Sequence, residues 1–138
     1  MLSIAPIARQ FFEDCESGKG WAVCRHWCTV DATFAAQAEP LADVRTLQQY
    51  TDWMTALLGF IPDGRYELKS FAVDDERRNV CAYAVFIGTH TGTGGPCAPT
   101  GRSVASDYAY VMFFDSDKIQ HVQKIWHAGL AMKQLGWV

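Results

Sequence analysis

The chain has 138 residues, a length typical of a single domain with its own hydrophobic core. Hydrophobic residues make up 49% of the sequence and charged residues 20%, a balance that excludes an intrinsically disordered chain. The net charge is −3, with 12 basic and 15 acidic side chains, so no nucleic-acid partner is expected, because such a partner needs a basic surface.

Hydropathy and cysteine content narrow the class further. No apolar run reaches the roughly 18 residues that a membrane-spanning helix needs, so no membrane partner is expected. Five cysteines are an odd number, and at least one of them cannot form a disulfide within the chain. Reduced, buried thiols are the simplest interpretation, and they predict a cytoplasmic protein.

The first part of the chain has the spacing of helices. Apolar residues at helical intervals over 4–15 predict a first helix, with Ser3 as its cap and Pro6 in its first turn. Serine and glycines at 17–20 end this helix. A shorter helix is expected over 21–27.

A longer helix is predicted after a short extended segment at 31–37. Asp43 is a suitable N-cap, and apolar residues then recur at helical spacing through about Leu58. Gly59 and Pro62 are expected to end this helix.

After residue 64 the apolar residues alternate, which is typical of strands. The predicted strands are 65–73, 80–91, 102–114 and 118–126, with a loop rich in glycine, proline and threonine before the third of them. A final short helix is expected over 129–135. Helices followed by a meander of strands predict an α+β domain, with the helices on one face of a twisted sheet and a cavity between the two layers.

Several motifs in the second half carry a family resemblance. They are Gly88-Thr89-His90-Thr91-Gly92, Ala98-Pro99-Thr100-Gly101-Arg102, Asp117-Lys118-Ile119, Trp126 and Lys133-Gln134-Leu135-Gly136. In this order they resemble the SnoaL-like polyketide cyclase branch of the nuclear transport factor 2-like (NTF2-like) superfamily. The resemblance implies one domain over 1–138, built as a cone in which a curved antiparallel or mixed sheet wraps around N-terminal helices. It also implies an apolar pocket and a homodimer.

The resemblance also indicates the positions at which the catalytic groups of such a cyclase would lie in this sequence. The cyclases resembled here use an aspartate on the last strand as acid and base, supported by a histidine on the preceding strand. Alignment through the shared motifs places the histidine position at Tyr110. The aspartate position falls at Lys124, or at Ile125 when Trp126 is brought into register. None of these residues is a carboxylate, so the known dyad is absent, although burial could lower the pKa of a lysine enough to make it a base.

Two residues near the predicted pocket could replace the missing acid and base. Asp107 is the only acid within the strand 102–114, and a carboxylate among small apolar side chains could move protons. Alternatively, it faces water or pairs with Arg102 or Lys124. His127 directly follows Trp126 and could reach a bound ligand, or it could cap the final helix instead.

A third acid/base candidate is His90, which lies where a long strand meets the glycine-rich loop. Alternatively, it bonds to loop carbonyls and only shapes the loop. Tyr110 and Tyr108 share one face of their strand and could hydrogen-bond a carbonyl oxygen in a dry pocket, or they could belong to the core or to a dimer interface. Trp53 and Trp126 are expected to wall the pocket beside Tyr108 and Lys124.

The cysteines give no metal motif. Cys24 and Cys28 share a helix face, but no second pair completes a zinc site, so they are predicted to be buried thiols. Cys97, in the glycine-rich loop, is the thiol expected to react if it is exposed, which leaves thiol sensing as a weaker hypothesis.

The sequence therefore predicts a small enzyme with neither cofactor nor metal. It would bind an apolar or polyketide-like carbonyl compound and catalyse proton transfer in a cyclisation, isomerisation or dehydration. Asp107 or His127 would be the base, and His90 and Tyr110 the donors to oxygen. The alternative is a non-catalytic module for small-molecule binding or dimerisation, because fold alone does not decide function.

Overall fold

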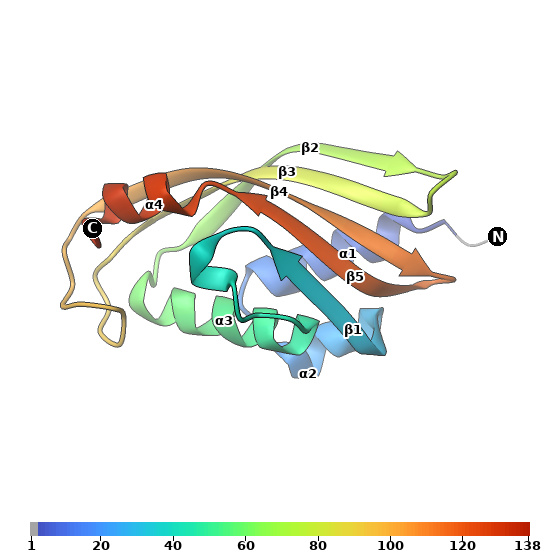
Figure 1. Ribbon diagram of the computed structural model, residues 1–138, viewed down its shortest axis with the longest axis horizontal. Helices are drawn as coiled ribbons and strands as arrows, with labels where there is room; N and C mark the ends of the chain where they lie inside the picture. Colours follow the sequence, from blue (N-terminus) through green and yellow to red (C-terminus); the bar gives the residue numbers. More distant parts are fainter. Residues whose placement is uncertain (1–2) are drawn as a thin grey trace.

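The computed structural model describes residues 3–138, in which helices pack against a curved five-stranded sheet (Figure 1). The elements in chain order are α1 (Ala5–Glu16), α2 (Trp21–Cys24), η1 (Arg25–Trp27), β1 (Cys28–Ala36), η2 (Glu39–Leu41), α3 (Leu47–Phe60), β2 (Arg65–Asp74), β3 (Asn79–Thr89), β4 (Ser103–Asp115), β5 (Lys118–Trp126) and α4 (Ala128–Leu135). This order confirms the predicted α+β cone with a mixed sheet.

The sheet has the strand order β1-β5-β4-β3-β2. The four strands from β2 to β5 form an antiparallel meander, whereas β1 runs parallel to β5 at the far edge. The first strand thus lies beside the last one, and the helices α1 to α3 lie on one side of the curved sheet (Figure 1). No helix within residues 3–138 combines the length and apolar character that crossing a bilayer requires.

Strand β4 shows how the sheet separates core from exterior. Its even-numbered residues from Val104 to Phe114 are buried against the helices, and its odd-numbered residues face outward. Because side chains alternate along a strand, this register places Tyr108 and Tyr110 inside.

Two of the predicted caps are wrong. Helix α3 is capped by Thr46, whose hydroxyl accepts from the Gln49 N–H while the Gln49 side chain accepts from the Thr46 N–H. This reciprocal pair is a capping box, and Asp43 lies too far upstream, in a turn after η2, to take part. Helix α1 begins at Ala5 after Ile4, so Ser3 is one residue too early to cap it.

Two further boundaries differ from the prediction. The helix expected over 21–27 is divided into α2 and the 3-10 turn η1. Strand β1 starts at Cys28 rather than at residue 31, because Cys28 already pairs with Ile119 of β5. A pairing partner so distant in the sequence leaves no local signal.

Candidate functional site

A cavity of about 250 Å³ lies between the helices and the inner face of the sheet. Its lining residues come from every layer of the fold and are Glu16, Pro40, Trp53, Met54, Leu57, Phe60, Ile61, Phe86, Pro96, Val104, Ser106, Tyr108, Lys124, Trp126, Ala131, Met132, Leu135 and Trp137. The wall is almost entirely apolar, and the ionisable groups in it are Glu16, Tyr108 and Lys124. A pocket of this kind, with few polar groups, is typical of small-molecule sites.

Glu16 is the centre of a buried polar cluster. It is the last residue of α1 and is 2% exposed. Its Oε1 accepts a hydrogen bond from the Tyr108 hydroxyl, at 2.5 Å. Its Oε2 accepts from Tyr50 at 3.2 Å and from Tyr110 at 3.4 Å. Three tyrosines from α3 and β4 thus converge on one carboxylate, and we call these four residues the tyrosine–glutamate cluster.

Lys124 adds a positive group to this cluster. It lies on the inner face of β5, is 5% exposed, and donates from Nζ to the Tyr50 hydroxyl oxygen at 2.9 Å. The Tyr50 hydroxyl therefore connects the amine to the Glu16 carboxylate.

Four aromatic rings surround the Lys124 amine. The distances from Nζ to the ring centroids are 4.9 Å for Tyr50, 5.4 Å for Trp53, 4.8 Å for Tyr108 and 5.1 Å for Trp126. Aromatic faces at these distances attract a cation. The amine is thus held in an aromatic cage, defined here as these four rings, that opens on the cavity.

Burial shifts the protonation of these groups in opposite directions. Burial lowers the pKa of the Lys124 amine, and the negative charge of Glu16 offsets part of this effect. Burial and the Glu16 charge both raise the pKa of the Tyr50, Tyr108 and Tyr110 hydroxyls. The tyrosines therefore remain hydrogen-bond donors, whereas the lysine is more easily deprotonated than an exposed one.

A family model described as SnoaL-like polyketide cyclase matches residues 7–135. The chain belongs to this family. Comparison with curated protein sequences found no match to this SnoaL-like chain.

Solved structures confirm the fold of the SnoaL-like chain. IdmH from Streptomyces antibioticus, described as a candidate polyketide cyclase, is 17% identical over 98% of this chain and 99% of its own, with a TM-score of 0.77. An NTF2-like protein from Burkholderia thailandensis is 18% identical over 99% and 98% of the two chains, with a TM-score of 0.75. A protein with a ketosteroid isomerase-like fold from Catenulispora acidiphila is 14% identical over 97% and 95%, with a TM-score of 0.70.

Four predicted ligand-binding residues line the cavity of this SnoaL-like protein. They are Trp53, Tyr108, Lys124 and Trp126. Tyr110 reaches the same cluster from behind, through its hydrogen bond to Glu16, but does not line the cavity. Of the two positions aligned with the family aspartate, Lys124 faces the cavity, whereas Ile125 is 65% exposed on the outer face.

Asp107 and His127 lie outside the cavity. Asp107 is exposed on the outer face of β4, where it accepts a hydrogen bond from the Tyr83 hydroxyl at 2.9 Å. The expected alternative pairing of Asp107 with Lys124 is wrong, because the two side chains lie on opposite faces of the sheet. His127 is the N-cap of α4, and its Nδ1 accepts from the Leu130 N–H at 3.0 Å.

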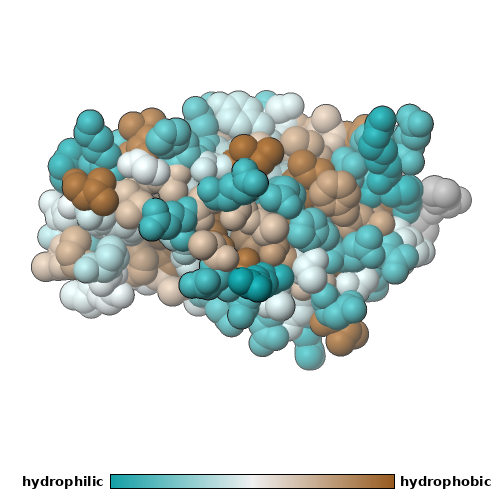
Figure 2. Space-filling model, in the orientation of Figure 1, coloured by the Kyte–Doolittle hydropathy of each residue, from teal (hydrophilic) through white to brown (hydrophobic). Residues whose placement is uncertain are grey.

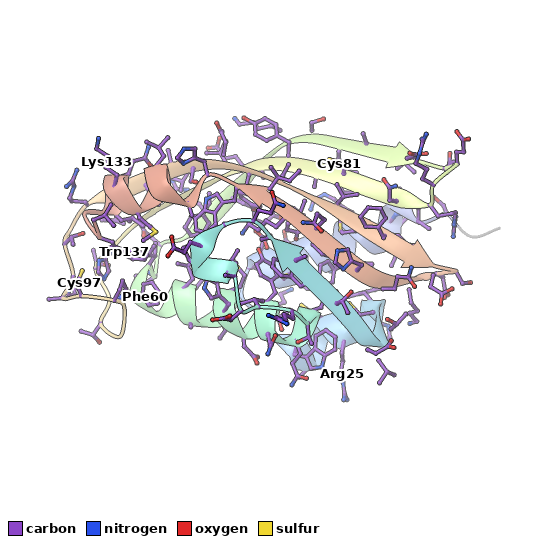
Figure 3. All side chains as sticks on the ribbon, in the orientation of Figure 1. Arg25, Phe60, Cys81, Cys97, Lys133 and Trp137 are labelled. Atoms are coloured by element: carbon purple, nitrogen blue, oxygen red, sulfur yellow. The ribbon has the colours of Figure 1, made fainter. Side chains whose placement is uncertain are left out.

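His90 is fully buried beside the cavity wall rather than in it. Its Nδ1 accepts from the Trp137 indole at 3.0 Å and from the Thr100 N–H at 3.3 Å. Its ring and those of Phe60 and Trp137 lie within 6.0 Å of one another, and Figure 3 shows Phe60 and Trp137 side by side at this end of the fold. His90 thus fixes a wall that Phe60 and Trp137 form.

The glycine-rich loop packs closely against α3 at this wall. The Gly92 N–H donates to the Phe60 carbonyl at 3.0 Å, and a Cβ at Gly92 would lie only 2.3 Å from the Gly59 carbonyl oxygen. Only glycine permits this approach. The motif residues of this loop therefore shape the wall of the cavity.

Sequence reasoning singled out neither Glu16 nor Tyr50 as a functional residue. The signal for Glu16 is its spacing, since Ala8, Phe12 and Glu16 follow one another at intervals of four and share the buried face of α1. An acid on a buried helix face needs partners, so it is a candidate for function.

The cysteines are free thiols, and no metal-binding group is found in the part of the chain that the structure describes. Cys15, Cys24 and Cys28 are buried free thiols, and Cys97 is exposed in the loop (Figure 3). Within residues 3–138, no three His, Cys, Asp or Glu side chains are grouped so as to hold a metal ion.

Proposed function

We propose that this protein binds a small apolar carbonyl compound in the cavity and catalyses proton transfer on it. The observation that supports this function best is the hydrogen-bonded chain from Lys124 through Tyr50 to Glu16, both ends of which line a largely apolar cavity. Acid/base chemistry needs a donor and an acceptor within reach of one ligand, in a site that excludes water.

The chain of hydrogen bonds supports a defined division of roles. When the Lys124 proton passes to the Tyr50 oxygen and the Tyr50 proton passes to Glu16, the amine becomes neutral and can accept a proton from the carbon beside the carbonyl. The hydrogen bond from the Tyr108 hydroxyl to Glu16 is weaker when Glu16 is protonated than when it is a carboxylate. The Tyr108 hydroxyl can then donate to the carbonyl oxygen of the ligand and stabilise the enolate.

Cavity size limits the ligand. A volume of about 250 Å³ lies just below the roughly 300–1,000 Å³ typical of ligand pockets. We therefore propose a compound of about one or two rings, bound with its carbonyl toward Lys124 and its apolar part toward Phe60 and Trp137.

A second candidate function is binding without turnover. The specific observation in its favour is that the Lys124 amine, the Glu16 carboxylate and the three tyrosine hydroxyls already bond to one another. A cluster whose hydrogen bonds are complete without a ligand can hold the cavity walls in place and take no part in a reaction.

Indanone, a small fused-ring ketone, tests both candidates. Binding is measured by quenching of tryptophan fluorescence, since Trp53 and Trp126 line the cavity. Turnover is measured by NMR as exchange of the protons beside the carbonyl in deuterium oxide. We expect both signals from the wild type, and retained binding with lost exchange from Lys124→Met.

Lys133→Met is the matched control, because Lys133 is exposed on α4. It should leave binding and exchange unchanged. Binding by the wild type without exchange above the buffer rate would favour the binding module, and absence of binding would contradict both candidate functions.

A further inference from the structure

We propose that Lys124 is a nucleophile that forms an imine with the carbonyl ligand. This proposal rests on the proposed function, because it requires a carbonyl compound to enter the same cavity. It goes further by giving Lys124 a covalent role: the amine binds the ligand as an imine, and the Glu16 carboxylate takes over from the amine as the base.

Among the polar groups of the cavity wall, the Lys124 amine is the one available to attack a carbonyl carbon. The Ser106 hydroxyl oxygen accepts from the Trp126 indole at 2.8 Å, and Glu16 and Tyr108 bond to each other. The hydrogen bond between Lys124 and Tyr50 leaves the other valences of the amine directed at the aromatic cage and the cavity. A lysine desolvated in an apolar pocket is the usual nucleophile for imine formation.

The aromatic cage suits both cationic forms of the Lys124 nitrogen in this reaction. An ammonium ion and an iminium ion both carry one positive charge at the same nitrogen. The four ring centroids lie 4.8–5.4 Å from that nitrogen, and the Glu16 carboxylate lies behind Tyr50. The site therefore stabilises the covalent intermediate with the contacts that it makes to the free lysine.

The steps balance with the groups present and water. The Lys124 proton first passes through Tyr50 to Glu16, and the amine lone pair then forms a C–N bond while the carbonyl electron pair moves to oxygen. One proton moves from nitrogen to that oxygen, and the Glu16 proton returns through the cluster, so that the oxygen leaves as water. The nitrogen lone pair completes the C=N bond of an iminium ion.

The iminium ion then makes proton transfer easier. It withdraws electrons from the neighbouring carbon, whose proton passes to the Glu16 carboxylate and leaves an enamine. Reprotonation and addition of water reverse the sequence and release the carbonyl compound and the amine. No oxidant or reductant takes part. The burial that lowers the pKa of Lys124 also enlarges the fraction of neutral amine near neutral pH.

Reductive trapping with naphthaldehyde and sodium cyanoborohydride tests the proposal at neutral pH. Intact mass gives the number of adducts, and peptide mapping compares Lys124 with Lys69 and Lys133, both of which are exposed. We expect labelling of Lys124 to be faster by about tenfold for each unit by which its pKa is lowered. Excess indanone should protect Lys124 without protecting Lys133.

Variants separate the amine from its surroundings. Lys124→Arg and Lys124→Met should each lose the fast adduct, whereas Lys133→Met should keep it. Tyr50→Phe should slow labelling at Lys124 and leave the rate at Lys133 unchanged, because it interrupts the path that deprotonates the amine. If the Lys124 variants do not fold, as judged by circular dichroism, protection of the wild type by indanone decides the question.

The possible outcomes are distinguishable. A fast adduct at Lys124 that indanone suppresses supports the imine. Equal labelling rates at Lys124 and the exposed lysines, with indanone still bound and its protons still exchanged, would overturn the imine and leave the proposed function intact. Failure of indanone to bind would overturn both.

Discussion

Glu16 is a buried acid that links the packing of the core to the wall of the cavity. A carboxylate 2% exposed is tolerated only when hydrogen bonds replace its water, and three hydroxyls do so here. The same bonds hold Tyr108 and, through Tyr50, Lys124 at the cavity wall. One buried acid thus serves both the stability of the core and the placement of the proposed site.

The hydroxyls in this cluster are not equivalent, and unfolding measurements should separate them. Tyr50→Phe removes a group that accepts from Lys124 and donates to Glu16, so we expect a loss of about 1–3 kcal/mol in the free energy of unfolding. Tyr110→Phe removes a single bond of 3.4 Å, and we expect a loss of about 0.5–1.5 kcal/mol. Urea unfolding of both variants is the measurement, and equal losses would contradict this ranking.

At the scale of the elements, helix α3 supplies Tyr50 and Trp53 from its first two turns. The position of these side chains therefore depends on how the helix begins. The capping box of Thr46 and Gln49 sets that start, and a shift of one residue would turn both aromatic rings away from Lys124.

The cap can be tested with a matched pair of variants. Thr46→Ala removes the hydroxyl that accepts from the Gln49 N–H, and we expect thermal unfolding to show a loss of about 1 kcal/mol. Asp43→Ala should change stability by less than about 0.5 kcal/mol, because its side chain caps no helix. A larger effect at Asp43 than at Thr46 would contradict the assigned cap.

Hydropathy patterns in the sequence predicted the helices and strands well, but they predicted contacts between distant parts of the chain less well. Alternation over 102–114 predicted β4 to within one residue at each end, because a half-buried strand carries that signal in its own sequence. The same alternation could not tell which face of β4 lies inside. That choice is made by contacts distant in the sequence, such as the one between Tyr108 and Glu16, which lie 92 positions apart, and no spacing within the strand reports such a contact.

The residues of the proposed site, too, were predicted only in part from the sequence. Trp53, Tyr108, Lys124 and Trp126 could be predicted because the family resemblance placed their strands and helix around a pocket. Asp107 and His127 were chosen for their chemistry, but strand parity and the start of α4 place them outside the cavity. Chemical type alone says nothing of the direction in which a side chain points.

At the scale of the whole molecule, the two faces of the sheet differ in character. The inner face holds the cavity and the buried cluster, whereas the outer face carries exposed apolar residues such as Ile125 among polar ones. Figure 2 shows hydrophobic and hydrophilic residues interspersed over one side of the molecule. The homodimer implied by the resemblance stays a prediction, for which the outer face offers the surface.

The buried tyrosines should make the protein sensitive to alkali. Their pKa values are raised in the folded state, so above about pH 10 the unfolded chain loses tyrosine protons that the folded chain keeps. The stability that they contribute is present below pH 10 and falls as the pH rises, by about 1.4 kcal/mol per pH unit for each tyrosine.

Lys124 acts in the opposite sense. Because its pKa is lowered in the folded state, the unfolded chain still holds the Lys124 proton at pH values where the folded chain has lost it. The contribution of Lys124 to stability therefore becomes more favourable as the pH rises to about 10.4 and is constant above that pH. Urea unfolding between pH 8 and about pH 11.5 measures the combined effect of the tyrosines and Lys124 on the free energy of unfolding. Tyr110→Phe should make the loss of stability above about pH 10 less steep by the contribution of one tyrosine. An identical slope in that variant would contradict this account.

The parallel pairing of β1 with β5 also has a consequence for how the chain matures during synthesis. Strand β1 emerges early from the ribosome, but its only neighbour in the sheet of residues 3–138 is the last strand to be made. Until β4 has been made, the Glu16 carboxylate lacks Tyr108, and until β5 has been made, it lacks the connection through Tyr50 to Lys124, so it must stay hydrated. The nascent polypeptide is therefore unable to close its interior progressively, and productive folding waits for a late, cooperative step, as expected for topologies rich in distant contacts.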